Sequence, residues 1–199
     1  MTKGRLEAFS DGMIAVFITI MVLELKVPHG SDWAALRPMA PTFCTYVMSY
    51  VFLGIYWNNH HHLLHATTRI NGKILWANLH LLFWLSLVPL TTGWMGENHL
   101  APLPTAVYGA DLLLSAISYF ILQGSILAHE GAHSRLAAAL GRDLKGKLSL
   151  AFYAAAIPLA FVRPWIAFLV YVVVALMWLI PDRRIESALD HRGNPPSEG

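Results

Sequence analysis

The sequence predicts an all-α integral membrane protein with six membrane-spanning helices. Three observations lead to this fold class: the composition, the length of the apolar segments and the placement of the basic residues. Of the 199 residues, 56% are hydrophobic and 13% are charged, with a mean hydropathy of +0.50. A soluble domain carries about 25% charged residues. A soluble core cannot hide so much apolar surface from water, so the bilayer is the expected solvent.

The apolar segments set the number of spans, because a spanning helix needs about 20 mainly apolar residues. The first four candidates cover residues 9–27, 41–57, 74–94 and 103–128. A polar segment, 129–147, separates them from the apolar block 148–180. That block is too long for one helix, and Arg163-Pro164 interrupts it. We therefore predict two short helices that meet at this turn.

The basic residues test the count independently. With six spans and the N-terminus inside, eleven of the 14 Lys and Arg lie on cytoplasmic segments, and three lie outside. Cytoplasmic loops normally carry this excess. Merging the last two spans would put eight Lys and Arg on the cytoplasmic side and five on the outer side, with Arg163 inside the membrane. We predict one six-helix transmembrane domain over 1–182 and a short cytoplasmic tail over 183–199, with both termini cytoplasmic.

Several function classes are excluded by composition and motifs. A net charge of +2, with scattered basic residues, argues against nucleic-acid binding. The single cysteine, Cys44, excludes an internal disulfide framework. Walker, Rossmann, GxSxG and HExxH patterns are missing. We expect neither an enzyme of these classes nor a cofactor.

The first span opens with Arg5-Leu-Glu-Ala-Phe9-Ser10-Asp11-Gly12. In one interpretation Ser10 caps the helix and Asp11 interacts with the positive end of its dipole. Arg5 and Phe9, however, already have helical i, i+4 spacing. If the helix runs from about Arg5, Asp11 lies inside it and needs a partner, and a charge within a span usually marks function. We favour the second interpretation.

Farther along this span, Val16, Ile20 and Leu23 recur at +4 and +3 and form one stripe, with Thr19 beside it. Such a stripe is usually a helix-packing surface. An apolar stripe also suits a pore whose constriction gates by dewetting. The spacing does not choose between these two interpretations.

A histidine-rich segment ends the second span, with His60, His61, His62 and His65 close together, and the pair His129 and His133 lies farther along. Imidazole is a common ligand of zinc and iron, so a histidine-rich membrane metalloenzyme is one hypothesis. The alternative is an interfacial belt of Trp, Tyr, Asn and His without metal. We favour the belt, because the clusters lack the repeated HxxHH pattern.

The other acidic residues within the predicted spans are Glu24 and Asp111, and the spans lack the regularly spaced arginines of a voltage sensor. Glu24 lies near the outer end of span one, where it can concentrate cations. Asp111, in span four, is expected to pair or to face the bundle interior, without an identified partner. No span carries Arg at three-residue spacing, so voltage sensing is not expected.

Together these motifs resemble the prokaryotic members of the transmembrane protein 175 potassium-channel family. The resemblance covers roughly the first half of the chain and rests on five segments: Arg5-xxx-Phe9-Ser10-Asp11-Gly12, Val22-Leu23-Glu24-Leu25-Lys26-Val27-Pro28, Tyr56-Trp57-xx-His60-His61, Leu75-Trp76-x-Asn78-Leu79 and Ser86-Leu87-Val88-Pro89.

The resemblance implies a homotetramer in a prokaryotic plasma membrane, with a central pore lined by the first helix. Apolar side chains would form stacked rings there, at Val16, Ile20 and Leu23, with a hydroxyl layer at Thr19. The family often has Ile or Leu where this chain has Val16, which widens that ring.

The resemblance also implies a network at the cytoplasmic end that ties the first helix to the second and third; its expected members are Arg5, Phe9, Ser10, Asp11, His61 and Asn78. The implied function is a K+-permeable, non-voltage-gated leak channel. A proton or mixed cation channel is the first alternative, and the metalloenzyme is the second.

Overall fold

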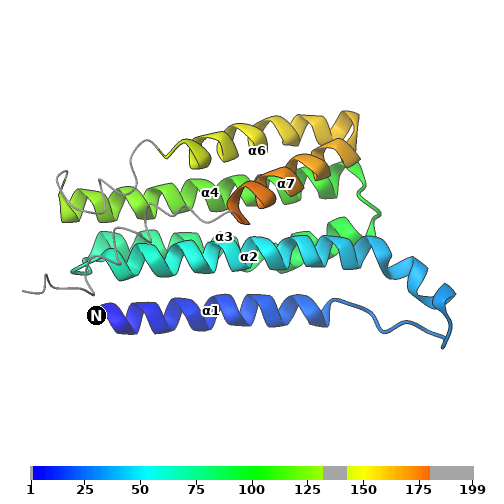
Figure 1. Cartoon of the computed structure of the whole chain (residues 1–199), viewed down its shortest axis with the longest axis horizontal. Coiled ribbons are helices and arrows are strands. Elements are labelled where there is room, and N and C mark those ends of the chain that lie inside the picture. Colours follow the sequence, from blue (N-terminus) through cyan, green and yellow to red (C-terminus); the bar gives the residue numbers. More distant parts are fainter. Residues whose placement is uncertain (1, 132–142, 180–199) are drawn as a thin grey trace, which may run out of the picture.

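The computed structural model describes residues 2–131 and 143–179, and all regular structure in this part of the chain is helical. Figure 1 shows the helices lying side by side in an elongated bundle. They are α1 (Lys3–Leu23), the short 3-10 helix η1 (Trp33–Met39), α2 (Ala40–Ala66), α3 (Gly72–Glu97), α4 (Pro102–Glu130), α6 (Leu144–Val162) and α7 (Pro164–Leu179). The predicted all-α class is confirmed.

Five candidate spans are long and apolar enough to cross a membrane, by length and composition: α1, η1 with α2, α3, α4 and α6. The apolar helix α7 is shorter, at 16 residues. The break predicted at Arg163-Pro164 is present, since α6 ends at Val162 and α7 begins at Pro164. Proline suits the first position of a helix, where its missing N–H is not needed. The predicted tail, 183–199, lies outside the described residues.

Most of the long helices extend beyond the predicted apolar segments. α1 begins at Lys3 rather than at residue 9, and α2 continues to Ala66, nine residues past its predicted end at Trp57. Hydropathy marks only the part of a helix suited to hydrocarbon, whereas backbone hydrogen bonding continues through polar residues. The histidine-rich segment is therefore the last part of α2 and not a loop.

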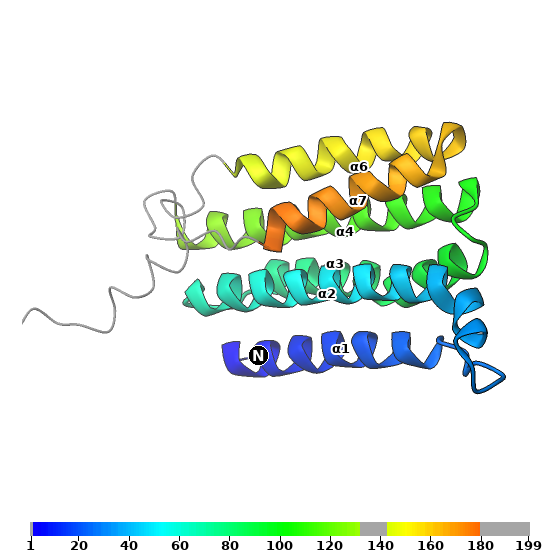
Figure 2. The same cartoon turned by 45° about the vertical axis from the view of Figure 1, so that its right-hand side comes forward.

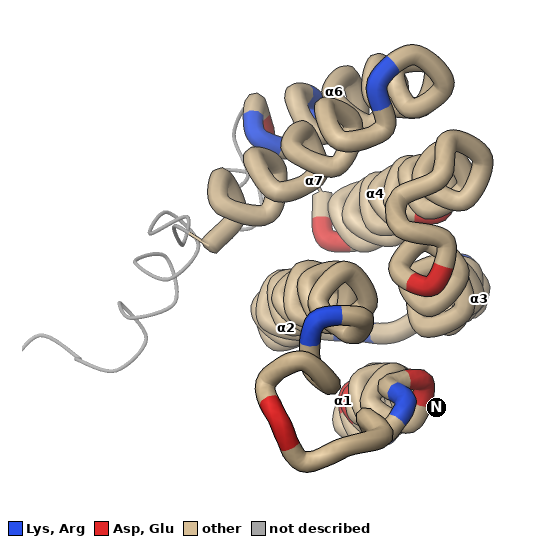
Figure 3. Tube along the Cα trace, turned by 90° about the vertical axis from the view of Figure 1, so that its right-hand side faces the viewer, with Lys and Arg blue, Asp and Glu red and all other residues tan. Residues whose placement is uncertain are grey.

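The arrangement around α3 decides which faces are buried. Helix α3 packs against α1, α2 and α4, and α4 packs in turn against α6. Turning the molecule keeps the helices nearly parallel (Figure 2), and the view along the bundle places α1 at one edge, beside α2 and α3 (Figure 3). We call the end of the bundle that holds the start of α1 the N-side, and the opposite end the far side. One face of α1 is buried by its neighbours, and the other is left uncovered by the described residues.

A close helix contact at Gly109 gives a testable prediction. A Cβ atom at this position of α4 would overlap the ring and hydroxyl of Tyr171 on α7, whose Oη donates a hydrogen bond to the carbonyl of Thr105 (3.1 Å). We expect Gly109→Ala to lower the free energy of unfolding by about 1–3 kcal/mol, the usual cost of overpacking. Denaturant or thermal unfolding in detergent measures this loss.

The control is Gly124→Ala on the same helix, where an added Cβ meets nothing within 4 Å. Alanine is the better helix former by about 1 kcal/mol, so this variant is expected to be neutral or slightly more stable. Equal stability of the two variants would contradict the close α4–α7 contact.

Candidate functional site

A buried hydrogen-bond chain joins α1, α3 and α2 near the N-side. Asn78 Nδ2 donates to Ser10 Oγ (2.9 Å), and Asn78 Oδ1 lies 2.6 Å from His60 Nε2. All three side chains are fully buried. Because the Asn78 amide nitrogen donates to Ser10, its oxygen is the acceptor, so His60 Nε2 carries the proton. This hydrogen-bond chain fixes the rotation of α1 against its two neighbours.

This geometry decides between the two interpretations of Ser10 and shows which histidine contacts Asn78. Ser10 does not cap α1, because Thr2 occupies the N-cap position and Ser10 lies inside the helix. The histidine that reaches Asn78 is His60, and the expected network member His61 lies beside Trp57 instead. Adjacent residues on a helix are rotated by about 100°, so only one of them faces α3. Since the run His60–His62 has no internal marker, sequence reasoning had no basis for choosing His60.

Asp11 lies inside α1 and has a partner, as the favoured interpretation of the motif required. Trp57 Nε1 of α2 donates a hydrogen bond to Asp11 Oδ1 (3.0 Å). The Trp57 ring lies 6.2 Å from the ring of His61, which stacks in turn on His65 at 6.1 Å. His61 is therefore near Asp11 through Trp57. A tryptophan is an easily missed partner, because charge pairing gives no reason to look for one.

The other two predicted network members point away from this contact. Arg5 is exposed, and Phe9 is 44% exposed. Their spacing places them on the same side of α1 as Val16 and Leu23, not on the side of Ser10. Within the described residues, the motif thus divides between a buried half that holds α1 in the bundle and an exposed half.

The stripe predicted as a possible pore lining lies on the uncovered face of α1. Val16 is 49% exposed, Ile20 is 42% exposed and Leu23 is 80% exposed, and Thr19 is exposed beside them. Thr19 Oγ1 donates its proton to the Val16 carbonyl (2.9 Å). Its oxygen lone pairs therefore remain free to contact a cation.

The far side carries the charged residues that follow this stripe. Glu24 is exposed beside Gly93 of α3, and the Lys26 ammonium donates to Glu97 Oε1 (2.6 Å). This hydrogen bond to Glu97 raises the pKa of Lys26 above its ordinary value. An open depression of about 510 Å³ is lined partly by these three charged residues. Lys26 and Glu97 pair with each other, and Glu24 is a further exposed carboxylate at this end of α1.

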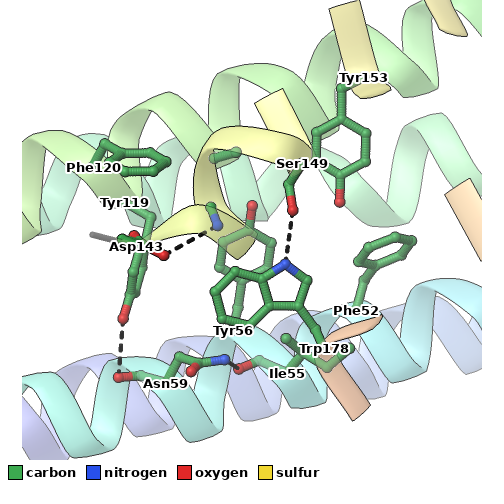
Figure 4. Close-up of a pocket in the computed structure, with 12 residues that line it drawn as sticks. Phe52, Ile55, Tyr56, Asn59, Tyr119, Phe120, Asp143, Ser149, Tyr153 and Trp178 are labelled. Atoms are coloured by element: carbon green, nitrogen blue, oxygen red, sulfur yellow. Dashed lines mark hydrogen bonds between the residues drawn. The ribbon is translucent and has the colours of Figure 1, made fainter. Parts of the chain in front are cut away.

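A small aromatic-lined cavity of about 40 Å³ lies elsewhere, between α2, α4, α6 and α7. Figure 4 shows Trp178 and Tyr153 bordering it, with Trp178 Nε1 donating to Ser149 Oγ (2.8 Å). No α1 residue lines it. The cavity therefore belongs to helix packing and is separate from the exposed stripe.

A cluster of the kind that a histidine-rich metalloenzyme needs is missing from residues 2–131 and 143–179, since no three His, Cys, Asp or Glu lie close enough together to hold a metal ion. Glu130, which the sequence placed in a polar hinge, ends α4 and accepts a hydrogen bond from the Thr68 backbone N–H (2.6 Å). His133 lies outside the described residues. Most of the described histidines instead make ring contacts or hydrogen bonds; these are His60, His61, His62, His65, His80 and His129.

Comparison with known proteins identifies what the chain is similar to. Residues 5–89 match the family model described as "Endosomal/lysosomal potassium channel TMEM175". A potassium channel of Chryseobacterium sp. (strain P1-3) is 56% identical over 189 residues, covering 95% of this chain and 98% of that protein. The crystal structure of a lysosomal potassium-selective channel TMEM175 homolog from Chamaesiphon minutus matches with a TM-score of 0.78 and 25% identity, covering 90% of this chain and 97% of that one. The Gallus gallus endosomal/lysosomal proton channel TMEM175 is 30% identical over 146 residues, covering 65% of this chain and 29% of that protein.

Proposed function

Because the chain belongs to the TMEM175 family of ion channels, we propose that four copies surround a shared axis, present α1 to it and conduct K+. The observation that carries the proposal is the exposed apolar stripe Val16, Ile20 and Leu23, on the face of α1 that the described bundle leaves uncovered. A single copy of this α1 stripe cannot enclose a water path alone. Four copies around a closed axis can, and closed cyclic symmetry is usual for oligomers.

In this arrangement the stripe forms stacked apolar rings, and the rings are the constriction. An apolar side chain offers no oxygen to replace the water that an ion loses, so dehydration limits passage. K+ is more weakly hydrated than Na+ and crosses at lower cost. The selectivity produced in this way is modest, and Thr19 supplies a layer of hydroxyl lone pairs that face the ion.

The remaining parts of the proposal follow the positions of the charges. Six described Lys and Arg lie at the N-side and three at the far side, which supports a cytoplasmic N-side by the positive-inside rule. We assign residues 1–182 to a single channel domain and 183–199 to a cytoplasmic tail, in the plasma membrane of a prokaryote. Without an arginine ladder, the channel is a leak channel that voltage does not gate.

The test is K+ flux into liposomes that contain the purified protein, with a subunit count in detergent. We expect flux above that of empty vesicles and a tetramer. Ile20→Ala and Leu23→Ala widen the rings, so the K+/Na+ permeability ratio is expected to fall about two- to fivefold, or about 0.4–1 kcal/mol. Bi-ionic reversal potentials measure this ratio.

Leu169→Ala is the matched control, because Leu169 is an exposed leucine of α7 on another part of the bundle. It should leave the ratio unchanged. A monomer, a lack of flux, or unchanged ratios in both α1 variants would contradict the shared-axis pore.

A proton or mixed cation channel is the second candidate function. Asp11, His61 and His65 place titratable groups at the N-side of α1 and α2, and several animal relatives are named proton channels. Reversal potentials under crossed K+ and H+ gradients separate the two functions. A reversal that follows the K+ gradient supports the first, and one that follows the H+ gradient supports the second.

The metalloenzyme alternative is not supported. The family and its curated relatives are named as ion channels, so the chain is a channel and not an enzyme.

A further inference from the structure

A buried polar cluster lies where α2, α3 and α4 meet, away from the exposed face of α1. Its members are hydroxyl groups and one carboxyl group: Ser49, Thr91, Thr92, Tyr108, Asp111 and Ser115. Thr91 Oγ1 donates a hydrogen bond to Asp111 Oδ2 (2.9 Å). This contact identifies the partner of Asp111 that the sequence analysis left open. Since α3 lies between α1 and α4, the cluster is separate from the proposed pore lining.

Part of the cluster satisfies its own hydrogen-bonding needs. Thr92 Oγ1 donates to Ser49 Oγ (2.7 Å), and Ser49 Oγ lies 2.9 Å from Tyr108 Oη. Two atoms of the cluster have no such partner: Asp111 Oδ1 and Ser115 Oγ. Asp111 is 4% exposed and Ser115 is fully buried. An unpaired polar atom at such a position is costly, and here there are two.

The residues that carry the two unpaired atoms are neighbours along α4. Asp111 and Ser115 are one turn apart on the same face of α4, where i and i+4 side chains are neighbours. Ser118 and Ser125 on this helix donate to their own helix carbonyls, at Leu114 and Ile121. Ser115 makes no such bond and keeps its oxygen available.

The charge of the cluster indicates what these atoms bind. In the described part of the chain, ion pairs join Lys3 to Glu7 and Lys26 to Glu97, at the two ends of the bundle, and neither pair includes Asp111. A bare carboxylate inside a bilayer-spanning bundle is unfavourable without a positive partner. One carboxylate balances one positive charge, whereas a divalent ion would leave an excess. Carboxylate and hydroxyl oxygens are ligands of hard cations.

We propose that Asp111 Oδ1 and Ser115 Oγ bind a small monovalent metal cation of the size of Na+ inside each subunit. Tyr108 and Leu112, on the same helix, are fully buried, and close packing favours a small ion over K+. The bound ion neutralises Asp111 and ties α4 to α3 through Thr91. It is a component of the folded subunit and not a step in conduction.

The experiment uses the purified full-length protein in detergent at one pH and one ionic strength, in NaCl, KCl or choline chloride. A ligand that binds only the folded state stabilises it by mass action. We expect Na+ to raise the melting temperature in a saturable way, beyond the effect of K+ or choline. Equilibrium dialysis with radioactive Na+ is expected to find one ion per chain.

Variants locate the site. Ser115→Ala is expected to weaken Na+ binding about tenfold, and Asp111→Asn to abolish it. Ser118→Ala is the control, because that hydroxyl bonds within its helix, and it should keep the full Na+ effect. If Asp111→Asn does not fold, Ser115→Ala and direct binding to the unmodified protein still decide the question.

The proposal would be overturned by equal melting temperatures in NaCl and choline chloride, by a lack of bound Na+, or by a Na+ effect that survives both substitutions. A melting temperature that follows pH but not Na+ also overturns it, because a proton then neutralises Asp111. Neither readout measures K+ flux, so the outcome is independent of the proposed channel function.

Discussion

Ile20→Lys is expected to reduce K+ flux about a hundredfold or more. In the proposed tetramer this substitution places four ammonium groups around the constriction. A unit charge about 4 Å from K+ repels it by about 1 kcal/mol in bulk water and about 4 kcal/mol at an effective dielectric constant of 20. Each 1.4 kcal/mol corresponds to about a tenfold change, so four charges exceed what this loss needs. Liposome flux at fixed protein density measures it.

Two control variants separate charge at the axis from other effects. Ile20→Met keeps an apolar side chain of similar size and should conduct. Leu144→Lys adds the same charge on α6, the helix farthest from α1 in the view along the bundle (Figure 3), where Leu144 is exposed. It should also conduct. Near-normal flux through Ile20→Lys that still forms the tetramer would contradict a pore lined by this face of α1.

Asn78→Leu is expected to lower the free energy of unfolding by about 2–6 kcal/mol. Leucine nearly preserves the side-chain volume but removes both hydrogen bonds, leaving Ser10 Oγ and His60 Nε2 buried without these partners. Each buried polar group left unpaired costs about 1–3 kcal/mol. Thermal or denaturant unfolding in detergent gives the loss. The N-terminal half of α1 should lose amide-exchange protection first, because the hydrogen bond between Ser10 and Asn78 holds this helix against α3.

The matched control is Asn98→Leu, at the far end of α3. Asn98 is exposed, and its amide donates to the Trp94 carbonyl of its own helix (2.8 Å). Surface substitutions of this kind usually stay within about 0.5 kcal/mol. If both variants lost the same stability, the hydrogen bonds that join Ser10, Asn78 and His60 would not hold α1 in place.

The fold was largely predictable, because its signals are local. The length of each apolar segment and the Arg163-Pro164 break can be seen in consecutive residues. The bilayer requires each spanning segment to be apolar and helical along its length. The helix ends were less predictable, since a helix in contact with water continues through polar residues. The start of α1 at Lys3 and the end of α2 at Ala66 are examples.

The candidate site was predictable only in part, because its contacts join distant segments. Ser10 and Asn78 were both expected members of the network, and their contact joins residues 68 positions apart in the sequence. His60 was missed because the choice among neighbouring histidines depends on how α2 is rotated. Trp57 and Thr91 were missed as partners because a hydroxyl or an indole N–H can satisfy a carboxylate without opposite charge.

By itself the sequence determined that the protein lies in a bilayer, that it is all-helical and that it carries the family motif, since each of these follows from residue types along the chain. The tertiary structure alone decided which side of each helix is buried. Val16, Ile20 and Leu23 form a periodic stripe in the sequence, and only the packing of α1 on α2 and α3 leaves that stripe uncovered. Asp111 is one acidic residue among twelve in the sequence, and only the packing of α4 leaves one of its oxygens buried and unpaired, one helical turn from an unpaired serine. The physical reason is that burial depends on neighbours brought together by folding, and periodicity identifies a face without saying what covers it.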